Sequence, residues 1–313
     1  MNERLEAFSI SRGGVFTAEQ AARFDVDRHD LACLRSRGQI CRVRRDAYVL
    51  GEVWRAATPE ERLALRTRAV LAARVSGIAS HQSALALHGL PLLDPEREVD
   101  VVDDVVKPRV VSGVRITPPR KVGTVRFADA LAWVMVGGCP SLPISTAVVV
   151  TAARDGLLSG LVPLEAALRT RQCTLEHVKS ALGVVPLSPR GRQRAEGLLA
   201  HADPASESVG ETRTHVLLSD LGFRWRSQVR ITDAGGAFVA RVDFLVEGQV
   251  VVEFDGALKY DGLEGRAALV AEKLREDRLR ALGYAVVRLT WADLDHPGHV
   301  AAKIRQALGR LTA

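Results

Sequence analysis

The sequence predicts an α/β protein of several domains. Its 313 residues exceed the usual length of one domain, and an apolar share of 47% is enough to form buried cores. Cap residues followed by helical periodicity alternate with short runs of strand periodicity, so both kinds of element are expected. The patterns divide the chain into three predicted domains, 1–55, 56–203 and 204–313.

The first domain follows the pattern of a winged helix-turn-helix. A short helix is expected over 16–22, where Thr17 can cap it and Gln20 stands three residues later, as in a capping box. Asp27 can cap the next helix. The alternating residues of 39–49 then predict a small hairpin, the wing.

Basic side chains gather on the second helix and the wing. The only acid strictly between Arg28 and Arg45 is Asp30, and the whole chain carries a net charge of +6. Cations placed there can reach a major groove and clamp its phosphates, so duplex DNA is the predicted partner, with a solvated basic face as the alternative. The predicted nucleic-acid-binding residues are Arg28, Arg35, Arg37, Arg42, Arg44 and Arg45.

The second domain, 56–203, has a mixed α/β pattern without a catalytic motif. His81 and His88 are interpreted as packing or capping groups rather than metal ligands, and no cysteine pair has metal-site spacing. The predicted helices cover 59–75, 81–88, 145–154 and 163–168, and the predicted strands cover 99–102 and 110–116.

Neither a signal peptide nor an apolar run of membrane-spanning length is recognisable, so a cytoplasmic protein without a membrane partner is expected.

The third domain reads as helix, three strands, helix, strand and helix. A three-residue loop at 247–249 would pair Phe244 with Val252 and make one face of the hairpin apolar. The other face would then place Asp243 opposite Glu253, and Arg241 opposite Asp255. A two-residue loop would mix the faces and is rejected.

Two directly opposed carboxylates repel each other, so Asp243 and Glu253 need compensation by a metal ion, a shared proton or neighbouring cations. Carboxylate oxygens suit Mg²⁺ or Mn²⁺, and a metal-bound water can attack a phosphodiester. The alternative is a pair of solvated residues on an exposed face, bridged by Arg241.

Four motifs of this domain occur in the order found in the Vsr-like branch of the PD-(D/E)XK nucleases, which the domain resembles. The resemblance implies a restriction-endonuclease-like fold and Mg²⁺-dependent cleavage of nucleic acid. It implies that Asp243 and Glu253 are metal ligands and that Glu211 is the helical acid near the metal. The motifs are Ser208 to Glu211, Arg241 to Phe244, Val251 to Tyr260 and Glu272 to Trp291.

The sequence departs from that pattern at Asp255, which stands where a catalytic lysine is expected. Lys259 or Lys273 would supply the missing charge, or Asp255 would act as a third ligand. Glu211 also has a structural alternative, because Ser208 and Glu211 have capping-box spacing.

The N-terminal two-thirds resembles the winged-helix AbiEi-type antitoxin arrangement. The resemblance implies DNA binding, a tie to toxin–antitoxin or phage-defence biology, and a cognate toxin as a possible partner. It rests on the segments Gly14 to Thr17, Arg44 to Val49 and Ser80 to Ala84.

Two functional hypotheses follow. The first is a Mg²⁺-dependent endodeoxyribonuclease guided to DNA by its winged helix. The alternative is a DNA-binding transcriptional repressor or antitoxin that carries a degenerate nuclease domain.

Overall fold

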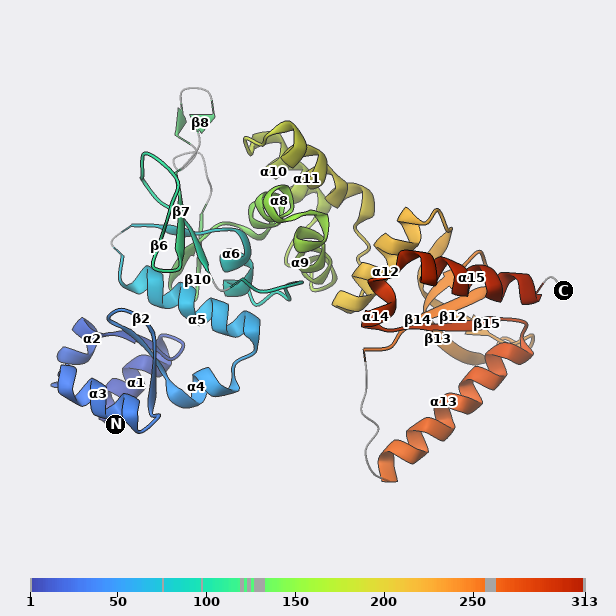
Figure 1. Ribbon diagram of the computed structural model, residues 1–313, viewed down its shortest axis with the longest axis horizontal. Coiled ribbons are helices and arrows are strands. Elements are labelled where there is room, and N and C mark those ends of the chain that lie inside the picture. The colour runs from blue at the N-terminus through green and yellow to red at the C-terminus, as the bar shows by residue number, and fades with distance from the viewer. Residues whose placement is uncertain are drawn as a thin grey trace. The chain divides into compact units, whose positions relative to one another are not determined.

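The computed structural model describes residues 2–74, 76–96, 98–118, 121–122, 125–126, 133–256 and 263–311. The chain forms two compact units, Met1–Ala202 and Asp203–Ala313 (Figure 1). Sheets of three, six and four strands and a two-stranded ribbon occur among the described residues. No described helix is long and apolar enough to cross a membrane.

The first unit begins with the arrangement of a winged helix. The predicted caps are confirmed, because Thr17 and Asp27 each form a capping box with the residue three positions later. The start of the first predicted helix is wrong by two residues, since Phe16 is extended and pairs with Tyr48. The elements are α1 (Glu3–Ser11), β1 (Val15–Thr17), α2 (Ala18–Ala22), α3 (Arg28–Ser36), β2 (Ile40–Arg44) and β3 (Ala47–Leu50).

Apolar burial fixes the helix α3 against the wing. Leu31 and Leu34 lie on its buried face, in one cluster with Phe16 and Ile40. The strands are ordered β1-β3-β2. The wing strand β3 therefore pairs both with its hairpin partner β2 and with β1, the strand before α2. Burial of these side chains leaves the polar face of α3 exposed.

The remainder of the first unit comprises a mixed sheet, ordered β10-β11-β4-β5-β7-β6, and a group of packed helices, α8 to α11. Helix α5 contacts the strands of the winged helix and also α6 and β5. The elements are α4 (Gly51–Ala56), α5 (Pro59–Ala72), β4 (Ile78–Ala79), α6 (His81–Leu87), β5 (Val99–Val102), β6 (Arg109–Val111), β7 (Val114–Thr117), β8 (Lys121–Val122), β9 (Val125–Arg126), β10 (Val134–Val136), β11 (Cys139–Ser141), α8 (Ile144–Asp155), α9 (Leu157–Arg169), α10 (Leu175–Val184) and α11 (Pro189–His201).

The single strand predicted over 110–116 is wrong. Ser112 and Gly113 both have positive φ, at 50° and 72°, and they reverse the chain between the antiparallel strands β6 and β7. Two consecutive positive φ values are typical of a tight hairpin turn. Most of 191–203, where no helix was predicted, belongs to the helix α11, which Ser188 caps and Pro189 begins.

The second unit has the predicted order of elements, with one short helix, α14, that was not predicted before the last helix. Its sheet is ordered β12-β13-β14-β15, with β14 antiparallel to β13 and parallel to β15. The predicted hairpin register is confirmed where Val246 pairs with Val250 and Phe244 with Val252. The elements are α12 (Val209–Asp220), β12 (Trp225–Thr232), β13 (Phe238–Val246), β14 (Val250–Phe254), α13 (Leu263–Ala281), β15 (Ala285–Leu289), α14 (Trp291–Leu294) and α15 (Pro297–Leu311).

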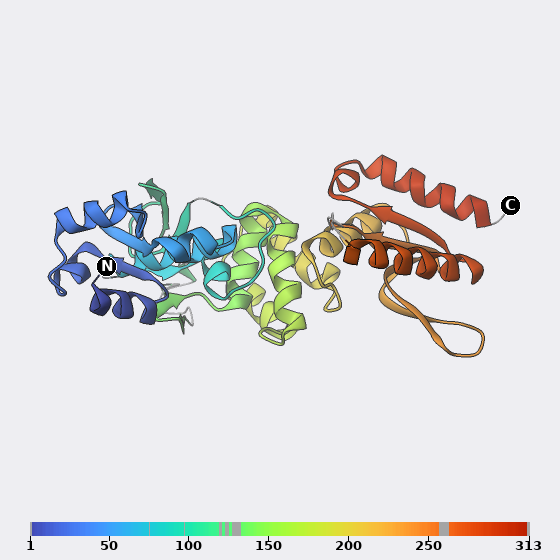
Figure 2. The same cartoon turned by 90° about the horizontal axis from the view of Figure 1, so that it is seen from below.

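Helices cover both faces of this sheet (Figures 1 and 2). Phe244 and Val252 pack on one face with Ile304 of α15. Leu245 and Val251 pack on the other face with Leu279 of α13. The second face is therefore apolar at the hairpin end, and its acidic residues lie toward the opposite end of the strands.

We predict that Gly210→Ala destabilises the second unit. A Cβ at Gly210 would lie 2.0 Å from Cε1 of Phe254, so the Phe254 ring would have to move. Overpacking of this kind costs about 1–3 kcal/mol. Scanning calorimetry should show a lower melting temperature for the unit that contains Gly210.

Gly298→Ala in α15 is the matched control, because a Cβ there meets no atom within 4 Å. The same substitution at Gly298 should leave the melting temperature equal or slightly higher. An equal fall in both variants would contradict the proposed clash.

Candidate nucleic-acid interface and acidic centre

The predicted DNA-binding arginines lie on α3 and on the wing hairpin. Arg28 and Arg35 are exposed on α3, Arg37 follows its end, and Arg42 and Arg45 are exposed on the wing. These five side chains therefore stand on the two elements that a winged helix presents to DNA.

The acids of α3 are occupied by helix capping. Asp27 accepts the Asp30 backbone N–H at 2.9 Å, and Asp30 accepts the Asp27 backbone N–H at 3.1 Å. The N–H donated by Asp30 is the largest influence on Asp27, and it lowers the pKa of that carboxyl. Neither acid forms an ion pair with a wing arginine in the described part of the chain.

Arg44 is the partly buried member of the set. It lines a groove of about 880 Å³ together with Arg28, Arg45 and Arg74. Burial is the main cause that lowers the pKa of Arg44, and the positive charge of Arg74 lowers it further. Cations that repel each other in a groove are stabilised by an added anion such as a phosphate group. The acids that also line the groove are Glu19, Asp27 and Asp46.

Arg74 was absent from the sequence prediction. It lies beyond the end of α5, and only the packing of α5 on the winged helix brings it to the groove. Arg74 also forms an ion pair with Asp103, whose second oxygen accepts Ser76 Oγ at 2.8 Å. No local pattern in the sequence links residue 74 to the wing.

The acidic centre of the second unit brings together the three predicted acids. Glu211 stands in the first turn of α12, Asp243 in β13 and Glu253 in β14. The pKa of Asp243 is raised to about 6, chiefly by burial. The Phe254 N–H, donated to Asp243 at 2.9 Å, opposes this shift, whereas the charges of Glu211 and Glu253 add to it. Asp243 therefore interacts electrostatically with each of the other two carboxylates.

Glu211 is held by hydrogen bonds rather than by cations. Its carboxylate accepts Gln228 Nε2 at 2.8 Å, Ser208 Oγ at 2.8 Å and the Glu207 N–H at 3.0 Å. Of the two hydrogen bonds of the predicted capping box, one is therefore confirmed. Ser208 Oγ does accept the Glu211 N–H, but the Glu211 carboxylate reaches Glu207 instead of the cap residue's own N–H.

Gln228 is a partner that the sequence did not indicate. It lies in β12 between two residues paired with β13, and its φ is 50°. A non-glycine residue in this conformation is strained, and such strain often accompanies a functional or tightly constrained position. Here the Gln228 side chain reaches the buried carboxylate of Glu211.

Glu253 is paired with arginine. Arg275 of α13 donates to both of its oxygens, at 3.2 Å to Oε2 through Nη1 and more closely to Oε1 through Nη2. The hydrogen bond to Glu253 is the largest cause that raises the pKa of Arg275. Arg288, the register partner of Glu253 on β15, lies 3.9 Å from Oε2.

The acids as arranged do not fit a metal ion. Among the described residues, no group of three His, Cys, Asp or Glu side chains is placed to hold one. Both oxygens of Glu253 face Arg275, and Asp243 accepts a backbone N–H. The metal-ligand roles of Asp243, Glu253 and Glu211 therefore stay predictions.

Of the two lysines proposed to replace the missing one, the structure describes only Lys273. Lys259 lies outside the described residues, and Lys273 is exposed on α13. The Asp255 backbone N–H donates to Leu289 O at 2.8 Å, which ties the end of β14 to β15. The cations that reach Glu253 are Arg275, which no sequence pattern indicated, and Arg288 at 3.9 Å.

The winged-helix segment matches a known protein family. Residues 3–51 match the family described as transcriptional regulator, AbiEi antitoxin. The predicted resemblance is confirmed for this segment, and the match supports DNA binding in a toxin–antitoxin context. No curated protein matches the chain.

The AbiEi match covers neither the Ser80 to Ala84 segment nor the second unit. The resemblance of the second unit to Vsr-like nucleases has no support from these comparisons, and it stays a prediction.

We predict a pH-dependent stabilisation by Asp243→Asn. The pKa of Asp243 rises from 3.8 to about 6 on folding, so its ionised form destabilises the folded state. This penalty is absent below pH 3.8 and is fully present above about 6. The variant's gain in melting temperature should therefore be large at pH 7.5 and small at pH 4.

Glu247→Gln is a control for which the opposite change in melting temperature is expected. The Arg224 N–H lowers the pKa of Glu247, so ionised Glu247 stabilises the fold and this contribution is lost on acidification. Its substitution should lower the melting temperature at pH 7.5 and have less effect at pH 4. A gain for Asp243→Asn that is equal at both pH values would refute the role assigned to its ionisation.

Proposed function

We propose that the chain is a DNA-binding transcriptional regulator of the antitoxin kind, with a cognate toxin as its partner. The observation that carries this proposal is the set of exposed arginines on α3 and the wing, within the segment that matches the AbiEi family. Of these exposed arginines, only Arg45 forms an ion pair in the described chain, with Asp46 at 3.6 Å.

Each element would have its own part in binding. Arg28 and Arg35 on α3 would face the base edges and phosphates of a major groove. Arg42 and Arg45 on the wing would contact the flanking backbone, which positions the protein without reading sequence. Arg44 and Arg74 would extend the contact with DNA to the protein groove that they line.

We predict that replacing Arg42, Arg44 and Arg45 together by Ala weakens binding to duplex DNA from the protein's own promoter region. The slope of log K against log salt is negative, and each phosphate contact contributes about 0.9 to its magnitude. Loss of three contacts should therefore make the slope less steep by roughly 2.7. Fluorescence anisotropy at several salt concentrations measures both the affinity and the slope.

The control removes the same charge from another surface of the first unit by replacing Arg109, Lys179 and Arg190, all exposed, with Ala. Its affinity and salt slope should stay close to those of the unsubstituted chain. Equal losses in the two triple variants would mean that net charge, not the wing, governs binding.

A second candidate function is metal-dependent hydrolysis of DNA by the second unit. Two observations favour it: the order of helix, three strands, helix and strand, and the electrostatic influence of Glu211 and Glu253 on Asp243. The ion pair between Arg275 and Glu253 argues against it, because it occupies the carboxylate that a metal would need. The acidic centre is therefore proposed to be degenerate.

We predict that the purified chain leaves supercoiled plasmid intact in Mg²⁺ or Mn²⁺. Both Glu253 oxygens are engaged by Arg275, which leaves no open carboxylate pair for a metal. Agarose gels of the plasmid after incubation provide the measurement.

Asp243→Asn and Glu253→Gln separate the outcomes. Nicking by the unsubstituted chain that both variants lose would overturn the degenerate-centre proposal and establish the second candidate function. Nicking of equal extent in all three proteins would identify a contaminating nuclease and leave the centre without activity of its own.

A further inference from the structure

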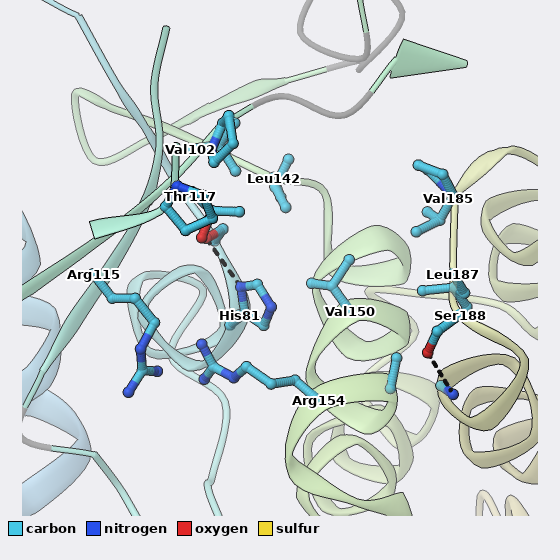
Figure 3. Close-up of a pocket in the computed structure, with 16 residues that line it drawn as sticks. His81, Val102, Arg115, Thr117, Leu142, Val150, Arg154, Val185, Leu187 and Ser188 are labelled. Carbon is cyan, nitrogen blue, oxygen red and sulfur yellow. Dashed lines mark hydrogen bonds between the residues drawn. The ribbon is translucent and has the colours of Figure 1, made fainter. Parts of the chain in front are cut away.

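A partly open cavity of about 370 Å³ lies in the first unit, and no residue of the winged helix lines it (Figure 3). Its walls come from the mixed sheet, from α8 and from the segment that joins α10 to α11. Most of the lining is apolar, with Val102, Leu142, Val150, Val185 and Leu187 among its members. The volume lies in the range of small-molecule sites, and an apolar lining with few polar groups is typical of them.

His81 supplies a polar group at one end of this cavity. Its Nδ1 lies 3.1 Å from Ser80 Oγ, and Figure 3 shows the ring turned toward the side of Val150. Within the described residues, Nε2 of His81 makes no hydrogen bond. Burial lowers the pKa of His81 to about 3, so the ring is neutral near pH 7.

The backbone at His81 is a second sign of a constrained position. Its φ is 48°, although it is the first residue of α6. A non-glycine residue with positive φ is strained, and such residues cluster at ligand-binding sites. The side chain of His81 is among those that line the cavity.

The arginines beside His81 are already neutralised. Arg154 pairs with Asp100 and Asp155, and Arg115 pairs with Asp100 at 3.3 Å. Two further carboxylates complete the set of four acids around the two guanidinium groups: Arg115 also pairs with Glu96 at 3.0 Å and Glu98 at 2.5 Å. An added anion would meet an excess of negative charge, so this end of the cavity favours an uncharged group.

We propose that this cavity binds an uncharged, largely apolar small molecule that carries one hydrogen-bonding group. Its apolar body contacts Val102, Leu142 and Val150, and its polar group pairs with Nε2 of His81. This site is separate from the arginines proposed to bind DNA, so it stands or fails independently of that function.

The uncharged dye Nile red tests for the site, because its fluorescence rises in an apolar environment. The full chain should bind it saturably. Leu187→Trp, which fills the cavity from the α10–α11 segment, should weaken binding by about tenfold or more.

The control for this variant is Val184→Trp. Val184 stands three residues earlier, is 59% exposed and does not line the cavity, so its substitution should leave binding unchanged. Unchanged binding in Leu187→Trp would overturn the proposal, because the dye would then be bound elsewhere.

His81→Asn tests the polar end while keeping a residue type that tolerates positive φ. Loss of one hydrogen bond should weaken Nile red binding by about five- to tenfold, with circular dichroism unchanged. Equal affinity in this variant would remove His81 from the site.

Competition tests the charge of the ligand. Octan-1-ol should displace Nile red at a concentration about tenfold lower than octanoate, since a buried carboxylate without a free cation is costly. Equal or better displacement by octanoate would overturn the assignment of an uncharged ligand.

Discussion

The ion pair between Glu253 and Arg275 governs the charge balance of the acidic centre. Opposed carboxylates on neighbouring strands require a metal, a shared proton or nearby cations. The described structure uses a nearby cation, because Arg275 holds both oxygens of Glu253. The pKa of Asp243, raised to about 6 chiefly by burial, eases the loss of its charge on acidification. Glu211 completes the balance through hydrogen bonds to Gln228 and Ser208. The centre is thus compensated by residues of its own chain.

Arginines have two distinct roles in this chain. Arg115, Arg154 and Arg275 are partly buried and bound to several acids, which makes them internal parts of the fold. The exposed arginines on α3 and the wing form few ion pairs with acids, so their positive charge is exposed to solvent. This distribution, more than the net charge of +6, distinguishes a surface for an external polyanion from internal ion pairing.

Local signals in the sequence predicted much of the fold. The caps at Thr17 and Asp27 and the pairing of Phe244 with Val252 depend on neighbours or on strand periodicity, and both were correct. The turn at Ser112 and Gly113 was missed because valines on both sides resemble one continuous strand. Arg74 and Arg275 could not be assigned, since each reaches its partners only through tertiary packing.

The proposed DNA-binding surface and the proposed hydrolytic centre depend on the fold in different ways. A DNA-binding surface needs cations that are exposed and only weakly compensated, and five predicted arginines satisfy this on elements whose positions follow from local caps and alternation. A hydrolytic centre needs carboxylates that remain open to a metal, and this depends on what the rest of the fold brings to them. Here α13 places the guanidinium group of Arg275 against Glu253. The spacing of the acids in the sequence did not reveal this ion pair.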